Sequence, residues 1–347
     1  MAELISESSI HKLNPTFQKE WGKLFNNLSL CFETNEKDKD EDSDISDKIV
    51  DKYIKHLYRD VIHKTTGDSM SLRFISPCYK PRHLINHYFD HIYILNLDSR
   101  PDRMDHMREQ LHELGIYSYE RFSALYGKES PHLEEWKKYS KVPLTRLERT
   151  KYQRKAIASP GSWAIIKSMY LMIRDAQSRG FKNFLVLQDD LLFHKSFHKQ
   201  FDQLVNNPNF PKTWKLFYIG ATQHTWTHVR FHKSQKFYHP SGTADGAFGV
   251  GVDSSIYDEF INELLEFDMP TDSGALKTLQ RRYSNESIVA FPNLVIADLR
   301  DSDLRGYRDL DTFSKKFRWD LKNYNIVDNL KPDETKMRQM KKDNMDW

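Results

Sequence analysis

The sequence of 347 residues has only two cysteines, Cys31 and Cys78. Two cysteines cannot build the disulfide framework of a small secreted protein, and such low usage favours a reducing compartment. No apolar run approaches 18 residues, so we expect no transmembrane segment. The first residues have neither a basic start nor an apolar run, so we expect no signal peptide. These absences predict a cytoplasmic protein.

A strong excess of one charge sign is also lacking. The chain has 52 Lys and Arg against 49 Asp and Glu, a net charge of +3, so a nucleic-acid partner would require a local basic patch. The apolar fraction is only 39%, but 21 Phe, 17 Tyr and 7 Trp provide enough large side chains for a core. The length fits one large domain with appendages.

Composition divides the chain into three predicted regions. Residues 1–85 form a helical N-terminal extension, interrupted at 33–48 by eight acidic residues and three lysines that predict a flexible linker. A helical appendage and a partner-binding role are both open for this extension. Residues 86–310 alternate strand and helix patterns and form the main domain, and residues 311–347 form a charged tail.

The most informative stretch is residues 184–193, Phe-Leu-Val-Leu-Gln-Asp-Asp-Leu-Leu-Phe. Its four leading apolar residues predict a strand buried on both faces, which ends at Asp189 and Asp190. Ligands of open α/β sheets lie at the carboxyl ends of strands, and paired carboxylates suit Mg²⁺ or Mn²⁺ carrying substrate phosphates. A polar turn that closes a core strand is the alternative.

An earlier stretch predicts a β-α-β unit: a strand at 92–97, a helix from Pro101 to Gly115 with Ser99 as its cap, and a strand at 116–122. The loop between the first strand and the helix could hold a nucleotide. Arg100 and Arg103 would bind phosphate and Asp98 would bind ribose hydroxyls, whereas ordinary surface charges are the alternative.

Further patterns complete the domain. We expect a helix that starts at Ser159–Pro160 and ends at Gly180, strands at 216–220, 242–252 and 288–296, and helices around 257–265 and 276–279. The domain closes with the carboxylates Asp298, Asp301 and Asp303.

Residues 136–155 contain eight basic residues and one acid, Glu148. This stretch could neutralise a diphosphate, face an anionic acceptor or contact nucleic acid, or it could be a solvated helix or lid.

Three blocks resemble glycosyltransferase family 25, which includes lipopolysaccharide-biosynthesis and collagen galactosyltransferases. Residues 94–103 are similar to the family's INLDxRxDR segment and residues 184–191 to its LVLEDD segment. Residues 160–162 lie where its G-C-x-x-S-H helix begins, and residues 270–272 lie where it has Pro-x-Asp. The resemblance covers about residues 90–305.

The resemblance implies a GT-A fold, an α/β sandwich that binds a nucleotide-sugar, and inverting transfer from a donor such as a UDP-sugar to a glycan, protein or lipid-linked acceptor hydroxyl. A divalent cation, Mn²⁺ or Mg²⁺, would neutralise the leaving diphosphate. The implied residues are Asn96, Asp98, Arg100, Arg103 and Gly161 for the donor, Asp189, Asp190 and Asp303 for the metal, and Asp272 as the base.

Asp272 could instead be only the cap of the following helix, and Asp245 is the next candidate for the base. The chain departs from the family at Gln188, where a glutamate is usual, and at Ile165–Ile166, where Ser-His is usual. These departures keep open a catalytically degenerate relative that acts as a binding or scaffold module. A nucleic-acid-associated protein is a weaker alternative.

Overall fold

The structure is a computed structural model that describes residues 85–326, apart from positions 228, 233–235, 301 and 305. The chain divides into two compact units, and of the first (residues 1–82 and 115–118) only residues 115–118 are described. The predicted N-terminal extension, its linker at 33–48 and the end of the tail therefore lie outside the described residues. Everything below concerns the second unit, residues 83–114 and 119–347.

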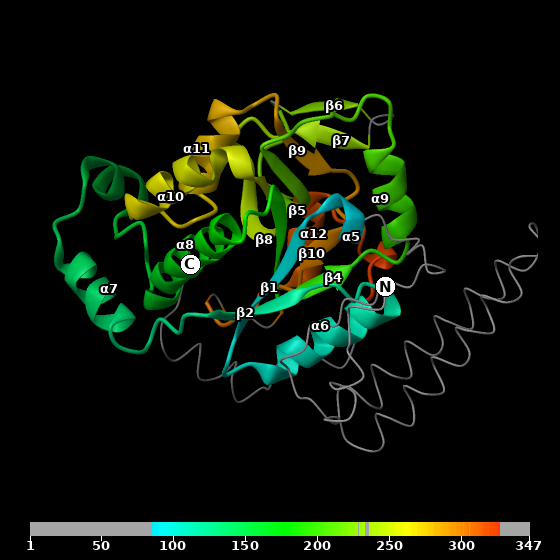
Figure 1. The fold of residues 1–347 in the computed structure, drawn as a ribbon. Helices are drawn as coiled ribbons and strands as arrows, with labels where there is room; N and C mark the ends of the chain where they lie inside the picture. Colours follow the sequence, from blue (N-terminus) through cyan, green and yellow to red (C-terminus); the bar gives the residue numbers. More distant parts are fainter. Residues whose placement is uncertain (1–84, 228, 233–235, 301, 305, 327–347) are drawn as a thin grey trace, which may run out of the picture. The chain divides into compact units, whose positions relative to one another are not determined.

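The second unit is built on an eight-stranded mixed sheet with the order β2-β1-β3-β8-β5-β9-β7-β6 (Figure 1). Its strands are β1 (His91–Leu97), β2 (Glu120–Ala124), β3 (Asn183–Gln188), β5 (Leu216–Gln223), β6 (Arg230–His232), β7 (Phe237–His239), β8 (Ala244–Asp253) and β9 (Ser287–Ala290). A second, two-stranded sheet pairs β4 (Leu191–Phe193) antiparallel with β10 (Val295–Ala297).

The directions of the strands bring several strand ends together at one edge of the large sheet. Strand β1 runs parallel to β2 and β3, and β5 runs parallel to β9, while β8 runs antiparallel between β3 and β5. The carboxyl ends of β1, β2, β3, β5 and β9 therefore share one edge. The amino end of β8 lies at the same edge, because Asp245 pairs with Thr222 near the end of β5. This edge is the expected ligand-binding side of an open α/β sheet.

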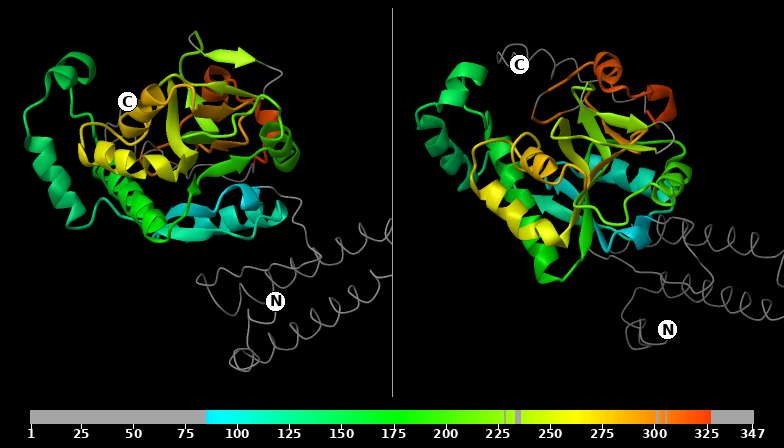
Figure 2. Two further views of the ribbon diagram at one scale, coloured as in Figure 1. Left: turned by 45° about the horizontal axis from the view of Figure 1, so that its top comes forward. Right: turned by 90° about the horizontal axis from the view of Figure 1, so that it is seen from above.

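Helices cover both faces of the sheet. The helices are α5 (Ile85–Tyr88), α6 (Pro101–Glu113), α7 (His132–Lys141), α8 (Pro160–Ser178), α9 (Phe197–Val205), α10 (Tyr257–Leu265), α11 (Ala275–Arg282) and α12 (Leu310–Phe317), with single turns at Glu148–Tyr152, Ser254–Ile256 and Leu321–Asn323. Helices α8, α10 and α11 lie together on one face, and α6, α9 and the β4–β10 pair cover the other (Figures 1 and 2).

Apolar packing fixes the strand that leads to the site. Phe184 and Val186 of β3 pack into the core beneath α8, which contributes Met169 and Ile173. Leu185 and Leu187 are equally buried, so β3 is covered on both faces, as its unbroken apolar run predicts. The expected helix at 160 is also confirmed, because the Ser159 hydroxyl accepts a hydrogen bond from the Ser162 N–H at the start of α8.

Several local predictions are wrong. Helix α6 is preceded by Arg100 at the cap position, with no side-chain cap, so Ser99 is not the cap. Strand β2 begins at Glu120 rather than at residue 116. The predicted strand at 288–296 is two strands, β9 and β10, in different sheets. Every residue of both strands is buried, so the apolar pattern of the sequence runs on from one strand to the next and does not mark the break between them.

The chain beyond residue 310 packs on the same unit. Tyr324 is buried, and its hydroxyl donates to the carbonyl of Asn293 at 2.7 Å. The Asn325 N–H donates to the carbonyl of Phe193, next to strand β4. The predicted boundary between residues 310 and 311 stays a prediction.

Candidate donor site

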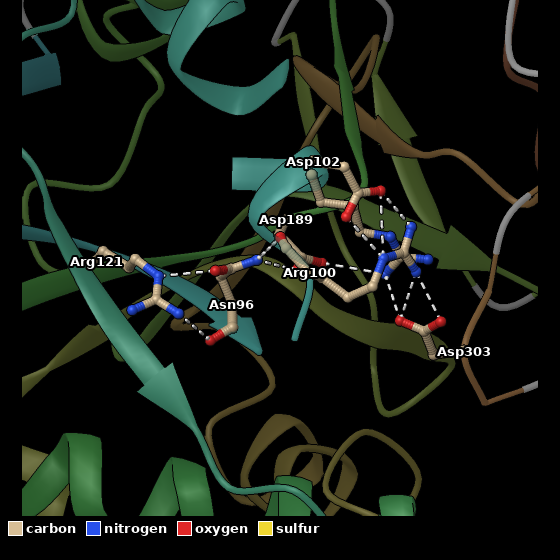
Figure 3. A network of polar contacts seen from close by, with 7 residues as sticks. Asn96, Arg100, Asp102, Arg121, Asp189 and Asp303 are labelled. Atoms are coloured by element: carbon tan, nitrogen blue, oxygen red, sulfur yellow. Dashed lines mark hydrogen bonds and ion pairs between the residues drawn. The ribbon is translucent and has the colours of Figure 1, made fainter. Parts of the chain in front are cut away.

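The centre of the site is Asn96, a buried residue near the end of β1 (Figure 3). Its Nδ2 donates to Asp189 Oδ2 at 2.7 Å and to the carbonyl of Arg100 at 2.9 Å. Its Oδ1 accepts from Nε of Arg121 at 2.7 Å. One amide therefore ties the end of β1 to the turn after β3 and to β2, because β1 pairs with both strands.

Asp98 is held by two residues of β2. Arg121 donates to Oδ1, and the Ser123 hydroxyl donates to Oδ2 at 2.8 Å. These hydrogen bonds lower the pKa of Asp98, first through Arg121 and then through Ser123. The carboxylate is thus ionised and largely exposed, so its remaining lone pairs can accept hydrogen bonds from a ligand.

Arg100 and Arg103 meet three carboxylates. Arg100 Nη1 lies 2.7 Å from both oxygens of Asp303, and its Nη2 lies 2.9 Å from Asp102 (Figure 3). Arg103 Nη1 lies 3.3 Å from Asp189 Oδ1 and 3.3 Å from Asp303 Oδ2. Both guanidinium groups are mostly shielded from solvent, with side chains 14% and 12% exposed, so these charges interact more strongly than they would in water.

The neighbouring carboxyl, Asp190, is less well satisfied. Its Oδ1 is buried and has no hydrogen-bond partner among the described residues. Burial raises the pKa of Asp190 to about 7, Arg103 opposes this rise, and Asp189 and Asp298 add to it. Burial also raises the pKa of Asp189, against the opposing effects of Arg103 and Asn96.

The local charge balance is negative. Asp98 is paired with Arg121, and Asp298 is paired with Arg300 at 2.7 Å. The remaining cluster sets two arginines, Arg100 and Arg103, against four carboxyls, Asp102, Asp189, Asp190 and Asp303. With all groups ionised it carries two uncompensated negative charges, which add to the effect of burial on the pKa of Asp190.

A divalent cation fits these residues. The orphaned buried oxygen of Asp190, with Asp189 beside it, is the hard oxygen donor set that Mg²⁺ and Mn²⁺ prefer. Among the described residues no group of three or more His, Cys, Asp or Glu side chains is close enough to hold a metal by itself. The two aspartates would therefore have to share a cation with water or substrate phosphate, as is common for Mg²⁺.

Gly161 lies at the start of α8 beneath the chain that carries Asp303. A Cβ atom on Gly161 would lie 2.3 Å from Cδ2 of Leu304, so a larger residue here would require the Leu304 side chain to shift. The side chain of Leu304 covers this position. The role of Gly161 in donor binding stays a prediction, as do the roles of the other site residues.

The structure does bring most of the predicted site residues into one network, with Asp190 beside it. The residues of this network are Asn96, Asp98, Arg100, Arg103, Asp189 and Asp303.

Asp272 belongs to a second cluster at the same edge. Its Oδ1 accepts from the Ser273 N–H at 2.8 Å, and Gly274 occupies the cap position of α11, so Asp272 is not the cap of that helix. Burial raises the pKa of the Tyr218 hydroxyl, the hydrogen bond from Gln280 opposes this rise, and the charges of Asp245 and Asp272 add to it. Asp245 is already paired, with Lys277 Nζ at 2.6 Å and His224 Nε2 at 3.4 Å.

The basic stretch forms a lobe made of α7 and the π-helical turn Glu148–Tyr152 (Figures 1 and 2). Burial opposes ionisation of Glu148, but N–H groups of Ala156 and Thr145 and the ammonium of Lys155 lower its pKa to about 2. The buried carboxylate of Glu148 therefore stabilises the lobe, while most of the basic side chains of the lobe are exposed. An anion-binding role and a solvated helix or lid both stay predictions for this stretch.

Sequence patterns missed Arg121, Ser123 and Asp102 as site residues. Arg121 and Ser123 are two positions apart on β2, so they point to the same face of that strand. That spacing was a usable signal, but its value depended on the parallel register that sets β2 beside Asn96.

A mixed sheet with helices on both faces is consistent with a GT-A-like α/β fold. Residues 89–244 match the model of glycosyltransferase family 25 (LPS biosynthesis protein). This match supports a glycosyltransferase enzyme. A search of curated proteins finds no match. None of the described helices is long and apolar enough to cross a membrane.

Proposed function

We propose that the enzyme moves a sugar from a nucleotide diphosphate donor, a UDP-sugar, to an acceptor hydroxyl with inversion and with the help of Mn²⁺ or Mg²⁺. The observation that carries this proposal is the buried, unpartnered oxygen of Asp190 within a cluster that has two excess negative charges. A donor adds further negative charge, so it should bind there more tightly with a cation that compensates it.

The nucleotide half of the donor would lie along the loop from Asn96 to Arg103. Asp98, ionised and exposed, would accept hydrogen bonds from ribose hydroxyls. Arg100 and Arg103 would bind the diphosphate, since the guanidinium fork matches phosphate geometry. Gly161 would let the chain approach the donor closely at the start of α8.

Asp189 and Asp190 would hold the cation, with Asp303 as a third ligand. The cation, when bound, neutralises the charge that develops on the leaving nucleoside diphosphate. Arg100 and Arg103 act in the same direction, because they stay protonated and face the same charge.

Asp272 is the proposed base. The acceptor oxygen forms a bond to the anomeric carbon, and the bond between this carbon and the phosphate oxygen of the donor breaks. The proton of the acceptor hydroxyl passes to the carboxylate of Asp272. Among the described residues this carboxylate accepts one hydrogen bond, from Ser273, and it is half-buried. Asp245 is the weaker candidate because Lys277 and His224 already engage it.

The experiment is a thermal-unfolding screen of the purified chain with UDP and Mn²⁺. A ligand at 100 times its dissociation constant stabilises the native state by about 2.7 kcal/mol. We expect UDP to stabilise the parent much more with Mn²⁺ than with chelator, and Asp190→Asn to lose that difference. Equal stabilisation of both proteins in both conditions would remove the cation from the proposal. Salt-dependent binding of oligonucleotides without any response to UDP would favour the nucleic-acid alternative.

A further inference from the structure

The described residues of 298–309 (all but 301 and 305), here called the strap, carry Asp303 to Arg100 and Arg103. Its carboxylate places both oxygens 2.7 Å from Nη1 of Arg100 and one oxygen 3.3 Å from Nη1 of Arg103 (Figure 3). The side chain of Asp303 is 32% exposed, so it reaches the arginines from the solvent side.

A carboxylate that contacts two arginines uses the same donors that a phosphate would use. The diphosphate of the donor and the carboxylate of Asp303 therefore compete for Arg100 and Arg103. Both are anions, so they repel each other unless positive charge between them compensates the repulsion.

Contacts within the strap and to α8 hold it in this position. Leu304 covers Gly161, the Gly306 N–H donates to the carbonyl of Ser302 at 2.9 Å, and the Arg308 N–H donates to that of Leu299 at 3.0 Å. Strap residues Arg300, Tyr307 and Asp309 also line a surface hollow of about 640 Å³. One side of the strap therefore faces open space, which leaves room for it to move.

We propose that Asp303 is a built-in occupant of the diphosphate site, and that donor binding transfers its carboxylate from the arginines to the cation held by Asp189 and Asp190. The inference rests on the proposed function and extends it to the order of events. Donor without cation has to displace Asp303 and leave it facing the diphosphate. Donor with cation gives Asp303 a new partner, because its carboxylate can then ligate the cation.

The first test measures binding of UDP and of inorganic pyrophosphate by calorimetry, in chelator and in Mn²⁺. In chelator, Asp303→Asn removes the competing charge, and we expect both ligands to bind about two- to fivefold more tightly than to the parent, the range for losing a partly exposed ion pair that competes with the ligand. In Mn²⁺ the parent gains affinity, whereas Asp303→Asn gains much less because it lacks the third carboxylate.

Asp102→Asn is the matched control. Asp102 contacts the same guanidinium, with 2.9 Å between its Oδ2 and Nη2 of Arg100, but it lies on α6 and not on the strap. If loss of one negative charge were the whole effect, Asp102→Asn would tighten metal-free binding equally and keep its response to Mn²⁺. Equal behaviour of the two variants in chelator and in Mn²⁺ would overturn the proposal.

The second test loosens the strap without changing its charge. Leu304→Ala removes the contact with Gly161, so we expect tighter metal-free pyrophosphate binding and faster amide hydrogen exchange in residues 302–308. For the parent, pyrophosphate in chelator should speed exchange of these amides, and UDP with Mn²⁺ should slow it. Exchange that responds to neither ligand would contradict a moving strap.

Failure of the inference and failure of the proposed function give different results. If pyrophosphate binds Asp303→Asn more tightly than the parent but UDP binds neither protein, the strap stands and the nucleotide donor is wrong. If UDP binds the parent in a Mn²⁺-dependent way and Asp303→Asn changes nothing, the proposed function stands and the strap is wrong. If neither ligand binds any variant, the arginines are not an anion site and both proposals fall.

Discussion

Replacing Asp190 by asparagine is expected to stabilise the metal-free protein at alkaline pH. Burial raises the pKa of this carboxyl to about 7, so the native state keeps the proton that the unfolded chain releases near the ordinary value of 3.8. Between these two values the native state binds more protons, and the free energy of unfolding therefore falls as pH rises. Above about pH 7 the native protein buries an ionised carboxylate with one unpartnered oxygen.

The difference between about 7 and 3.8 corresponds to about 4 kcal/mol at full ionisation if the site were rigid. Water entry and side-chain relaxation screen part of this cost, so we expect about half of it. Asparagine resembles the protonated carboxyl in size and carries no charge. The variant should therefore match the parent near pH 4.5 and exceed it by about 2 kcal/mol at pH 8.

The assay is urea unfolding in chelator at pH 4.5, 6 and 8, with Asp189→Asn as control. Asp189 accepts from both Asn96 and Arg103, and an asparagine would lose one of these bonds. It should be about 1–3 kcal/mol less stable than Asp190→Asn at pH 8. A parent whose stability does not fall between pH 4.5 and 8, or an Asp190→Asn protein less stable than the parent at pH 8, would refute the reasoning.

Three further predictions follow from single contacts. Arg103→Ala should weaken UDP binding by about 1.5–3 kcal/mol in calorimetry. The control Arg174→Ala, an exposed change on α8, should leave UDP binding unchanged. If Arg103→Ala binds UDP as tightly as the parent, the loop that carries Arg103 is only structural. Asp272→Asn should keep UDP affinity and lose about 10²- to 10⁴-fold in transfer rate, and a parental rate would move the role of base to Asp245. Glu148→Gln should lower the free energy of unfolding by about 1–3 kcal/mol in urea at pH 7, because the ionised carboxylate is held by Thr145, Ala156 and Lys155, and parental stability would contradict that assignment.

The parts of the fold that could be predicted are those where local pattern and burial agree. Strand β3 has an unbroken apolar run, and α8 has a serine cap, a proline in its first turn and Gly180 at φ +70° after its end. Where burial is complete, alternation no longer marks strand boundaries, so β9 and β10 were predicted as one strand. The charged composition after residue 310 also gave no sign that Tyr324 would be buried.

The site could be predicted in outline only. Carboxylates at the end of β3 and arginines after β1 were visible in the sequence, since each follows a recognisable strand. Their partners come from distant positions: Arg121 meets Asn96 through strand register, and Asp303 meets Arg100 across 203 residues. A charge pattern does not specify such pairings, so the competition between Asp303 and the donor is readable only in three dimensions.

The most direct test of the account is UDP release from a panel of UDP-sugars with a hydroxyl-bearing acceptor mixture, measured for the parent chain and for Asp190→Asn in Mn²⁺ and in chelator. We expect release by the parent in Mn²⁺ for at least one donor, little release in chelator, and little release by Asp190→Asn in either condition. Release by the parent that is undiminished in excess chelator, or equal release by Asp190→Asn, would contradict this expectation.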